Sequence, residues 1–362
     1  MAIYTPSAFT STAVQAACDA AYAAGGGVVY CAAGIYSWTS TLTIRSAVQV
    51  IGDGYGNGTD GVGTVFKQAG STNLSAMVVF YRSPDGVAAN AHNAGLHRVR
   101  LDGSKSTNTT TATDGIQAIT NPLWTAATSD NSSVGWDMHN SVTDVHVWYC
   151  KGNGFKADGR SEMNISRTFI RECDGHGFWP SADTNLSQCV AGVNGLAGFY
   201  LGYQGSIRLT ACKAWYSGQV TAAQGHGFWL QGINSGSVVL SGCEAQDNKA
   251  AGYFLDSSYA CEIQGAADSN STSGAGSYPA LLISNSYGSK CDVVGVDRAG
   301  TPTQTYGLKI TGSEGNKIYV SNRWLTNPTT ARSLDPTSTT TKNTIDHVYL
   351  NGTTATWGHV TG

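Results

Sequence analysis

The sequence is poor in charge: Asp, Glu, Lys and Arg make up 12 % of its 362 residues, and the formal net charge is −3. Binding to nucleic acid or to anionic membranes depends on concentrated basic charge, so this balance argues against both kinds of partner. No segment approaches the roughly 20 apolar residues that a membrane-spanning helix needs. The opening "MAIYTPSAFT" lacks the basic and apolar regions of a secretory signal, so we expect synthesis in a cytoplasm without a signal peptide.

Cysteine is present in an odd number, nine, with no close CxxC pair and no His/Cys spacing typical of a zinc site. We therefore expect reduced, buried thiols, and neither a metal nor a cofactor. The segment "DGYGNGTDG" (Asp53–Gly61) has some character of a calcium loop. It lacks the acidic third position and the closing Glu of an EF-hand, so a Gly-rich turn between strands explains it better.

Glycine, in contrast, is abundant at 45 residues, and it begins a short recurring motif of Gly, large apolar residue, any residue, apolar residue. The hexamer "GHGFWP" (Gly175–Pro180) returns as "GHGFWL" (Gly225–Leu230). A period in the twenties with one short strand per unit is typical of a solenoid. The main copies begin at Gly154, Gly177, Gly198, Gly227 and Gly252, 21 to 29 residues apart, with a further copy at Gly307, an earlier one at Gly115 and a degenerate one at Pro279.

A second, alternating strand precedes each Gly motif, and small or weakly polar residues recur at one inward position of it. Stacked coils lie about 4.8 Å apart, so residues of that column can touch. Period-two alternation, β-branched residues and a Gly in nearly every unit disfavour helical repeats. We therefore expect an all-β right-handed parallel β-helix with three short sheets per coil. The inward column comprises Val145, Thr168, Cys189, Cys212 and Cys243.

The N-terminal stretch Thr10–Ile44 predicts an α-helix that covers the first coil. Thr12 and Gln15 have the spacing of a capping box, and the glycines Gly25–Gly27 end the helix. A helix over the first coil covers a strand edge whose backbone N–H and C=O groups would otherwise be open to pairing with another chain. Its apolar face comprises Val14, Ala17, Cys18 and Ala21, and the strands "VVYC", "TLTI" and "VQVIG" follow.

The order "AVQAACDAA…GGGVVYCAAGIY…TLTI…VQVIGDG" resembles the N-terminal signature of the pectate-lyase-like β-helix superfamily. That superfamily includes bacteriophage tailspike and minor tail proteins as well as many polysaccharide lyases and hydrolases. The resemblance covers roughly the first 55 residues and then the coils to about Leu350. We expect one continuous structural domain, with a cap and first coils over 1–55, a β-helix body over 56–350 and a tail over 351–362.

Alternation within the Gly motif predicts a column of outward side chains, most of them aromatic. In "GFWL", Phe228 and Leu230 point inward and Trp229 points outward. Three interpretations stay open: a subunit interface, as in tailspike-like homotrimers; a platform on which sugar rings stack; or scattered surface aromatics covered by loops. The column reads Lys156, Trp179, Tyr200, Trp229, Phe254 and then Lys309.

Candidate catalytic groups are harder to find, because glycoside hydrolysis needs two carboxyls about 5–5.5 Å or 6.5–9.5 Å apart. The densest titratable cluster is Glu172, Asp174 and His176 in "ECDGHG", beside Trp179. Asp137 and His139 come second. Histidines in such turns, His176 and His226, are more often structural than catalytic. The outward residues Asp144, His146 and Trp148 face Arg167, Phe169 and Arg171 one coil on, where we expect ion pairing, as for Lys213 and Glu244.

The resemblance and the outward column together suggest a bacteriophage tail or tailspike-type virion protein that binds host cell-surface glycan, with or without depolymerase activity. The alternatives are a stand-alone polysaccharide lyase or glycoside hydrolase and a purely structural virion subunit. The expected partners are host-surface polysaccharide, other virion tail proteins and two further copies in a homotrimer. The expected location is the virion.

Overall fold

In a computed structural model, the chain winds into stacked coils of short strands. Its contacts divide the chain into two compact units, Met1–Cys189 (unit 1) and Val190–Gly362 (unit 2). The domain boundaries predicted near residues 55 and 350 stay a prediction. The structure describes residues 1–56, 62–80, 93–108, 112–119, 137–158, 161–202, 205–234, 237–273, 278–297, 304, 306–324, 332–334, 342–351 and 354–361.

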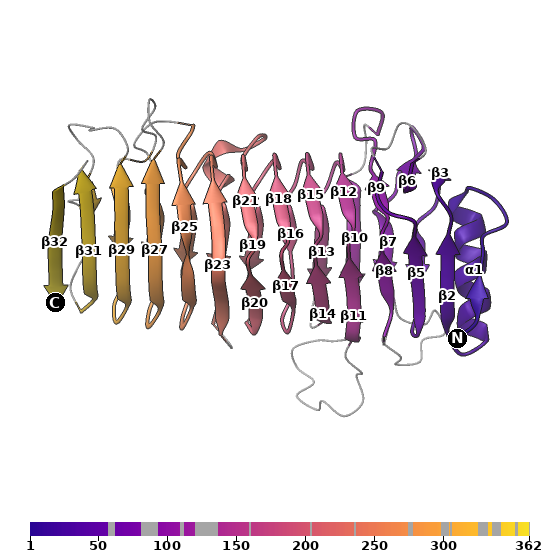
Figure 1. Cartoon of the computed structure of the whole chain (residues 1–362), viewed down its shortest axis with the longest axis horizontal. Coiled ribbons are helices and arrows are strands. Elements are labelled where there is room, and N and C mark those ends of the chain that lie inside the picture. The colour runs from indigo at the N-terminus through magenta and orange to yellow at the C-terminus, as the bar shows by residue number, and fades with distance from the viewer. Residues whose placement is uncertain are drawn as a thin grey trace. The chain divides into compact units, whose positions relative to one another are not determined.

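Unit 1 contains three rows of strands that pair in parallel from coil to coil (Figure 1). The first row is β4 (Leu42–Ile44), β7 (Ala76–Phe80), β10 (Asp114–Ile119), β13 (Phe155–Asp158) and β16 (Phe178–Trp179). The second is β1 (Ile3–Tyr4), β2 (Gly27–Cys31), β5 (Val48–Gly52), β8 (Gly95–His97), β11 (Asp137–Thr143), β14 (Ser161–Ser166) and β17 (Asn185–Ser187). The third is β3 (Gly34–Trp38), β6 (Thr64–Gln68), β9 (Arg100–Asp102), β12 (His146–Trp148) and β15 (Phe169–Arg171).

Unit 2 repeats this arrangement, and in it two of the three rows merge into longer strands. One row is β19 (Phe199–Gly202), β22 (Phe228–Gln231), β24 (Tyr253–Asp256), β26 (Leu281–Ser284), β28 (Tyr306–Thr311) and β30 (Arg332–Leu334). Strands β20 (Ile207–Thr210) and β21 (Lys213–Trp215) both pair with β23 (Val238–Gln246), and β18 (Val190–Gly192) pairs with β21. From β23 the row continues through β25 (Glu262–Asp268), β27 (Lys290–Asp297), β29 (Lys317–Trp324) and β31 (Thr344–Asn351) to the antiparallel β32 (Thr354–Thr361). This topology confirms the all-β right-handed parallel β-helix.

The core is built from columns of like side chains, one from each coil. In unit 2 the buried rings of Phe199, Phe228 and Tyr253 stack at 4.9 Å and 5.1 Å, with interplanar angles of 8° and 9°. The predicted inward column of Val145, Thr168 and three cysteines is buried throughout. All nine cysteines are buried free thiols, as expected. A hydrogen bond to Cys212, together with burial, raises the pKa of the Cys243 thiol, so this thiol stays protonated at neutral pH.

Buried asparagines in successive coils form a hydrogen-bonded ladder, which the sequence motifs did not predict. Asn248 Oδ1 accepts the Ser217 N–H at 3.0 Å, and Asn248 Nδ2 donates to Asn270 Oδ1 at 2.7 Å. Asn316 Nδ2 donates to Asn343 Oδ1 in the same manner, at 3.0 Å. These side chains satisfy backbone groups at the buried corners of the coils, where an unpaired N–H would cost stability.

The helix α1 (Ser11–Ala23) lies against β2 at the N-terminal end of unit 1 (Figure 1) and buries the predicted face, Val14, Ala17, Cys18 and Ala21. The predicted capping box is wrong. Thr10 is the N-cap, its Oγ1 accepting the Ala13 N–H at 3.2 Å, while Gln15 bonds both backbone groups of Thr43. Gly25 and Gly26 end the helix with positive φ, as predicted. Of the helices in the described residues, none has the length and apolarity to cross a membrane.

Candidate functional site

The repeated hexamer has the side-chain directions that alternation predicts. Phe178, Phe228 and Leu230 are fully buried, while Trp179 and Trp229 are half-buried on the outer face of their strands. The outer face of this row of strands is therefore where the predicted column lies.

In unit 2 the column forms an aromatic row of three residues, Tyr200, Trp229 and Phe254, on the adjacent strands β19, β22 and β24. The Tyr200 and Trp229 rings meet edge to face at 5.2 Å, and the Trp229 and Phe254 rings lie nearly parallel at 5.9 Å. Trp229 and Phe254 are half-buried, but Tyr200 is only 7 % exposed. Tyr200 therefore lies on the predicted outer face of its strand, where its neighbours cover it. Leu282 and Lys309 continue the row on β26 and β28.

A second, polar row runs beside the aromatic row, and the sequence analysis did not find it. Gln231 and Asp256 follow Trp229 and Phe254 by two residues, so they share the same face of β22 and β24. Tyr200 Oη donates to Gln231 Oε1 at 2.7 Å, and Gln231 Nε2 donates to Asp256 Oδ2 at 3.0 Å. The face therefore offers aromatic surface next to a fixed amide and carboxylate.

In unit 1 the corresponding pair is Lys156 on β13 and Trp179 on β16, which are register partners. The Lys156 ammonium lies 5.0 Å from the centre of the Trp179 ring. This distance is within the range of a cation–π interaction. Lys156, the first residue of the predicted column, is thus packed directly on the tryptophan.

The histidine of each hexamer packs behind the outward tryptophan. The ring of His226 lies 5.4 Å from that of Trp229 and 4.7 Å from that of Phe254, and its Nδ1 accepts the Ala251 N–H at 3.2 Å. The ring of His176 meets that of Trp179 at 5.7 Å, and both histidines are buried. The hexamer therefore recurs because its inward Phe, its outward Trp and the histidine supporting that Trp are needed together.

Burial lowers the pKa of His226 to about 3. The unfolded chain protonates histidine near its ordinary pKa of about 6.5, so the stability that depends on neutral His226 is complete above that value and is lost as the pH falls toward 3. We expect the His226 ring signals in NMR to show no titration between about pH 5 and 8. A His226 midpoint near 6.5 in the folded protein would contradict this burial.

The three residues of the predicted catalytic cluster, Glu172, Asp174 and His176, each contact a different partner. Arg171 donates to Glu172, Lys105 Nζ lies 2.8 Å from Asp174 Oδ1, and His176 packs against Trp179. Their catalytic role stays a prediction. Of the second candidate catalytic pair, His139 is exposed and has a positive φ, and the side chain of Asp137 lies outside the described residues.

The predicted ion pairs are confirmed. Arg167 donates two hydrogen bonds to the Asp144 carboxylate, at 2.7 and 2.8 Å, and these lower the pKa of Asp144. Lys213 and Glu244 are register partners with Nζ and Oε1 3.0 Å apart. Among the described residues no three His, Cys, Asp or Glu side chains gather as metal ligands. Asp53 of the Gly-rich segment accepts hydrogen bonds from Tyr30 and Ala33, and Asn57–Gly61 lies outside the described residues.

A family model for the right handed beta helix region matches residues 130–347. Among characterised relatives, mannuronan C5-epimerase AlgE3 of Azotobacter vinelandii is 32 % identical over 209 residues, which are 54 % of this chain and 9 % of the relative. Mannuronan C5-epimerase AlgE4 of the same organism is 29 % identical over 205 residues, 52 % of this chain and 29 % of the relative. The chain thus spans less than a third of the length of these relatives.

Solved structures share the fold at lower identity. The AlgE4 A-module of Azotobacter vinelandii superposes with a TM-score of 0.67 at 19 % identity, over 87 % of this chain and 91 % of that one. The enzymatically active domain of tailspike protein 2 of bacteriophage CBA120 gives 0.63 at 14 % identity, over 86 % and 44 % of the two chains. A DFA-IIIase from Arthrobacter chlorophenolicus A6 gives 0.63 at 14 %, over 95 % and 94 %.

Proposed function

Because this chain belongs to the right-handed β-helix family, we propose that it is a carbohydrate-acting β-helix protein whose glycan-binding face lies on β19, β22 and β24. The observation that carries the proposal is the aromatic row beside the polar row. A pyranose has an apolar face and a rim of hydroxyls, and it fits a surface that offers aromatic carbon next to fixed acceptors and donors. Trp229 supplies the first kind of contact, and Gln231 and Asp256 supply the second.

The relatives support a carbohydrate ligand, because the proteins that share 29–32 % identity with half of this chain are named for acting on mannuronan. We further propose that the protein is a phage tail or tailspike-type component that binds host-surface polysaccharide from the virion, as a homotrimer among other tail proteins. The fold shared with a phage tailspike domain is consistent with that role.

Incubation with purified capsular and cell-wall glycans tests the proposal and separates its rivals. Retention of glycan without new product supports a binding protein of the tailspike type. New reducing ends or unsaturated product absorbing in the ultraviolet indicate a hydrolase or lyase, and a changed uronate composition at constant chain length indicates an epimerase. Neither binding nor product across the panel would contradict a carbohydrate role and favour a purely structural subunit.

A further inference from the structure

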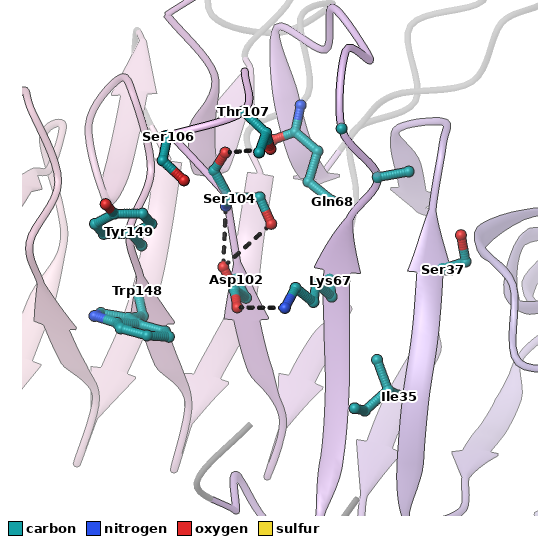
Figure 2. A pocket seen from close by; sticks show the side chains of 12 residues that line it. Ile35, Ser37, Lys67, Gln68, Asp102, Ser104, Ser106, Thr107, Trp148 and Tyr149 are labelled. Atoms are coloured by element: carbon teal, nitrogen blue, oxygen red, sulfur yellow. Dashed lines mark hydrogen bonds and ion pairs between the residues drawn. The ribbon is translucent and has the colours of Figure 1, made fainter. Parts of the chain in front are cut away.

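Unit 1 holds a pocket on a different row of strands from the proposed glycan-binding face. It lies over β3, β6, β9 and β12 and has a volume of about 560 Å³, which is in the range of small-molecule sites (Figure 2). Trp148 and Tyr149 form one side, Lys67, Ser37 and Ile35 the other, and Asp102 and Ser104 lie between them (Figure 2). Lys67, Asp102 and Trp148 are register partners in three successive coils.

The polar centre of the pocket is held in place before any ligand arrives. Asp102 accepts hydrogen bonds from the backbone N–H of Ser104 at 3.0 Å and from its hydroxyl at 3.4 Å. Its side chain is 5 % exposed, whereas that of Lys67, with Nζ 3.9 Å from Asp102 Oδ2, is 48 % exposed. A nearly buried carboxylate beside a half-exposed ammonium provides both an acceptor and a donor for ligand hydroxyls.

The aromatic side is also fixed. The Arg100 guanidinium lies 4.0 Å from the centre of the Trp148 ring, and the Tyr149 ring is 5.4 Å from Trp148. Backbone hydrogen bonds join this side to the loop that carries Ser104: Gly103 N donates to Trp148 O at 2.9 Å, and Lys105 N donates to Tyr149 O at 3.0 Å. The aromatic side and the polar centre are therefore one preformed unit, which reduces the entropy cost of binding.

Three cations around the pocket lie next to carboxylates, and a fourth, Arg100, packs on the Trp148 ring. Lys67 faces Asp102, Lys105 lies 2.8 Å from Asp174, and Arg171 pairs with Glu172. The lining itself contains one cation and one anion, so it does not select an anionic ligand. Its remaining polar side chains are hydroxyls and an amide, those of Ser37, Ser104, Ser106, Thr107 and Gln68.

We propose that this pocket is a second binding site, separate from the aromatic row, which takes one neutral pyranose residue. The apolar face of the sugar packs on Trp148 and Tyr149, vicinal hydroxyls donate to the Asp102 carboxylate, and Lys67 donates to a ring or hydroxyl oxygen. Because its ligand is uncharged, binding depends little on salt.

Saturation-transfer NMR on the full chain tests this site with a panel of free sugars: glucose, galactose, mannose, N-acetylglucosamine and fucose, with glucuronate and galacturonate as charged counterparts. We expect at least one neutral sugar to bind, with Kd unchanged within about twofold between about 0.05 and 0.5 M salt. Trp148→Ala and Asp102→Asn are each expected to weaken it at least about tenfold. Trp215→Ala, at a half-buried tryptophan outside both proposed sites, is expected to leave it unchanged.

Circular dichroism of each variant checks folding. If Trp148→Ala does not fold, sugar binding by the isosteric Asp102→Asn alone tests the pocket. Absence of binding by every neutral sugar, a preference for the charged sugars, or full binding by both pocket variants would each overturn the proposal. Loss of binding in Trp229→Ala with retention in Asp102→Asn would overturn it as well, since the sugar would then bind at the aromatic row. Failure here leaves polysaccharide binding by the aromatic row standing, because the two sites have separate variants.

Discussion

Replacement of Phe228 by Ala is expected to lower the free energy of unfolding by about 3–5 kcal/mol, because it opens a cavity in a stacked column. The Phe228 ring is fully buried between those of Phe199 and Tyr253, at 4.9 and 5.1 Å. Coils above and below cannot collapse into the gap, since their backbone hydrogen bonds fix the spacing near 4.8 Å. Urea denaturation followed by circular dichroism measures the effect.

The neighbouring residue provides the matched control. Trp229 is larger than Phe228 but points to the outer face and is half-buried. Trp229→Ala is therefore expected to cost less than half as much as Phe228→Ala, although it removes more atoms. If the tryptophan variant were the less stable of the two, the assignment of inner and outer faces would be wrong.

Removal of the Trp229 side chain is expected to reduce glycan retention at least about tenfold, because a central aromatic residue supplies a large share of the contact energy of such a face. Trp229 lies between Tyr200 and Phe254 and is held from behind by His226. Affinity chromatography or calorimetry with the glycan that the incubation screen identifies measures the loss.

Trp215→Ala is the control for this prediction, because Trp215 is a half-buried tryptophan of the same unit on β21, in another row of strands. It is expected to retain glycan. Solution mass distinguishes the rival interpretation of the column: if the column is a subunit interface, Trp229→Ala and Trp179→Ala shift the protein from trimer to monomer. Unchanged glycan retention in Trp229→Ala would contradict the sugar-binding interpretation.

Much of the fold could be predicted because a β-helix repeats a local rule. Alternation alone placed Phe178, Phe228 and Leu230 inside and Trp179 and Trp229 on the outer face. The helix N-cap could not be placed in the same way, because Thr10, Ser11 and Thr12 are all good capping residues. A tertiary contact excludes Ser11, because its Oγ accepts the N–H groups of Thr39 and Ser40 and is therefore engaged elsewhere.

The candidate sites were predicted less completely, because they depend on register between coils of unequal length. Gln231 and Asp256 form a polar row only once β22 and β24 are aligned. The pocket could not be predicted at all, since Lys67, Asp102 and Trp148 lie at unequal spacings along the sequence and carry no shared motif. For Tyr200, alternation predicted the outer face correctly but not the burial, because alternation gives the direction of a side chain and not what covers it.

A crystal structure with the glycan identified in the binding screen tests the central claim most directly. We expect sugar rings against Trp229 and Phe254, with hydroxyls within hydrogen-bond distance of Gln231 and Asp256. Polysaccharide bound to any other row of strands, with these four side chains uncovered, would contradict it.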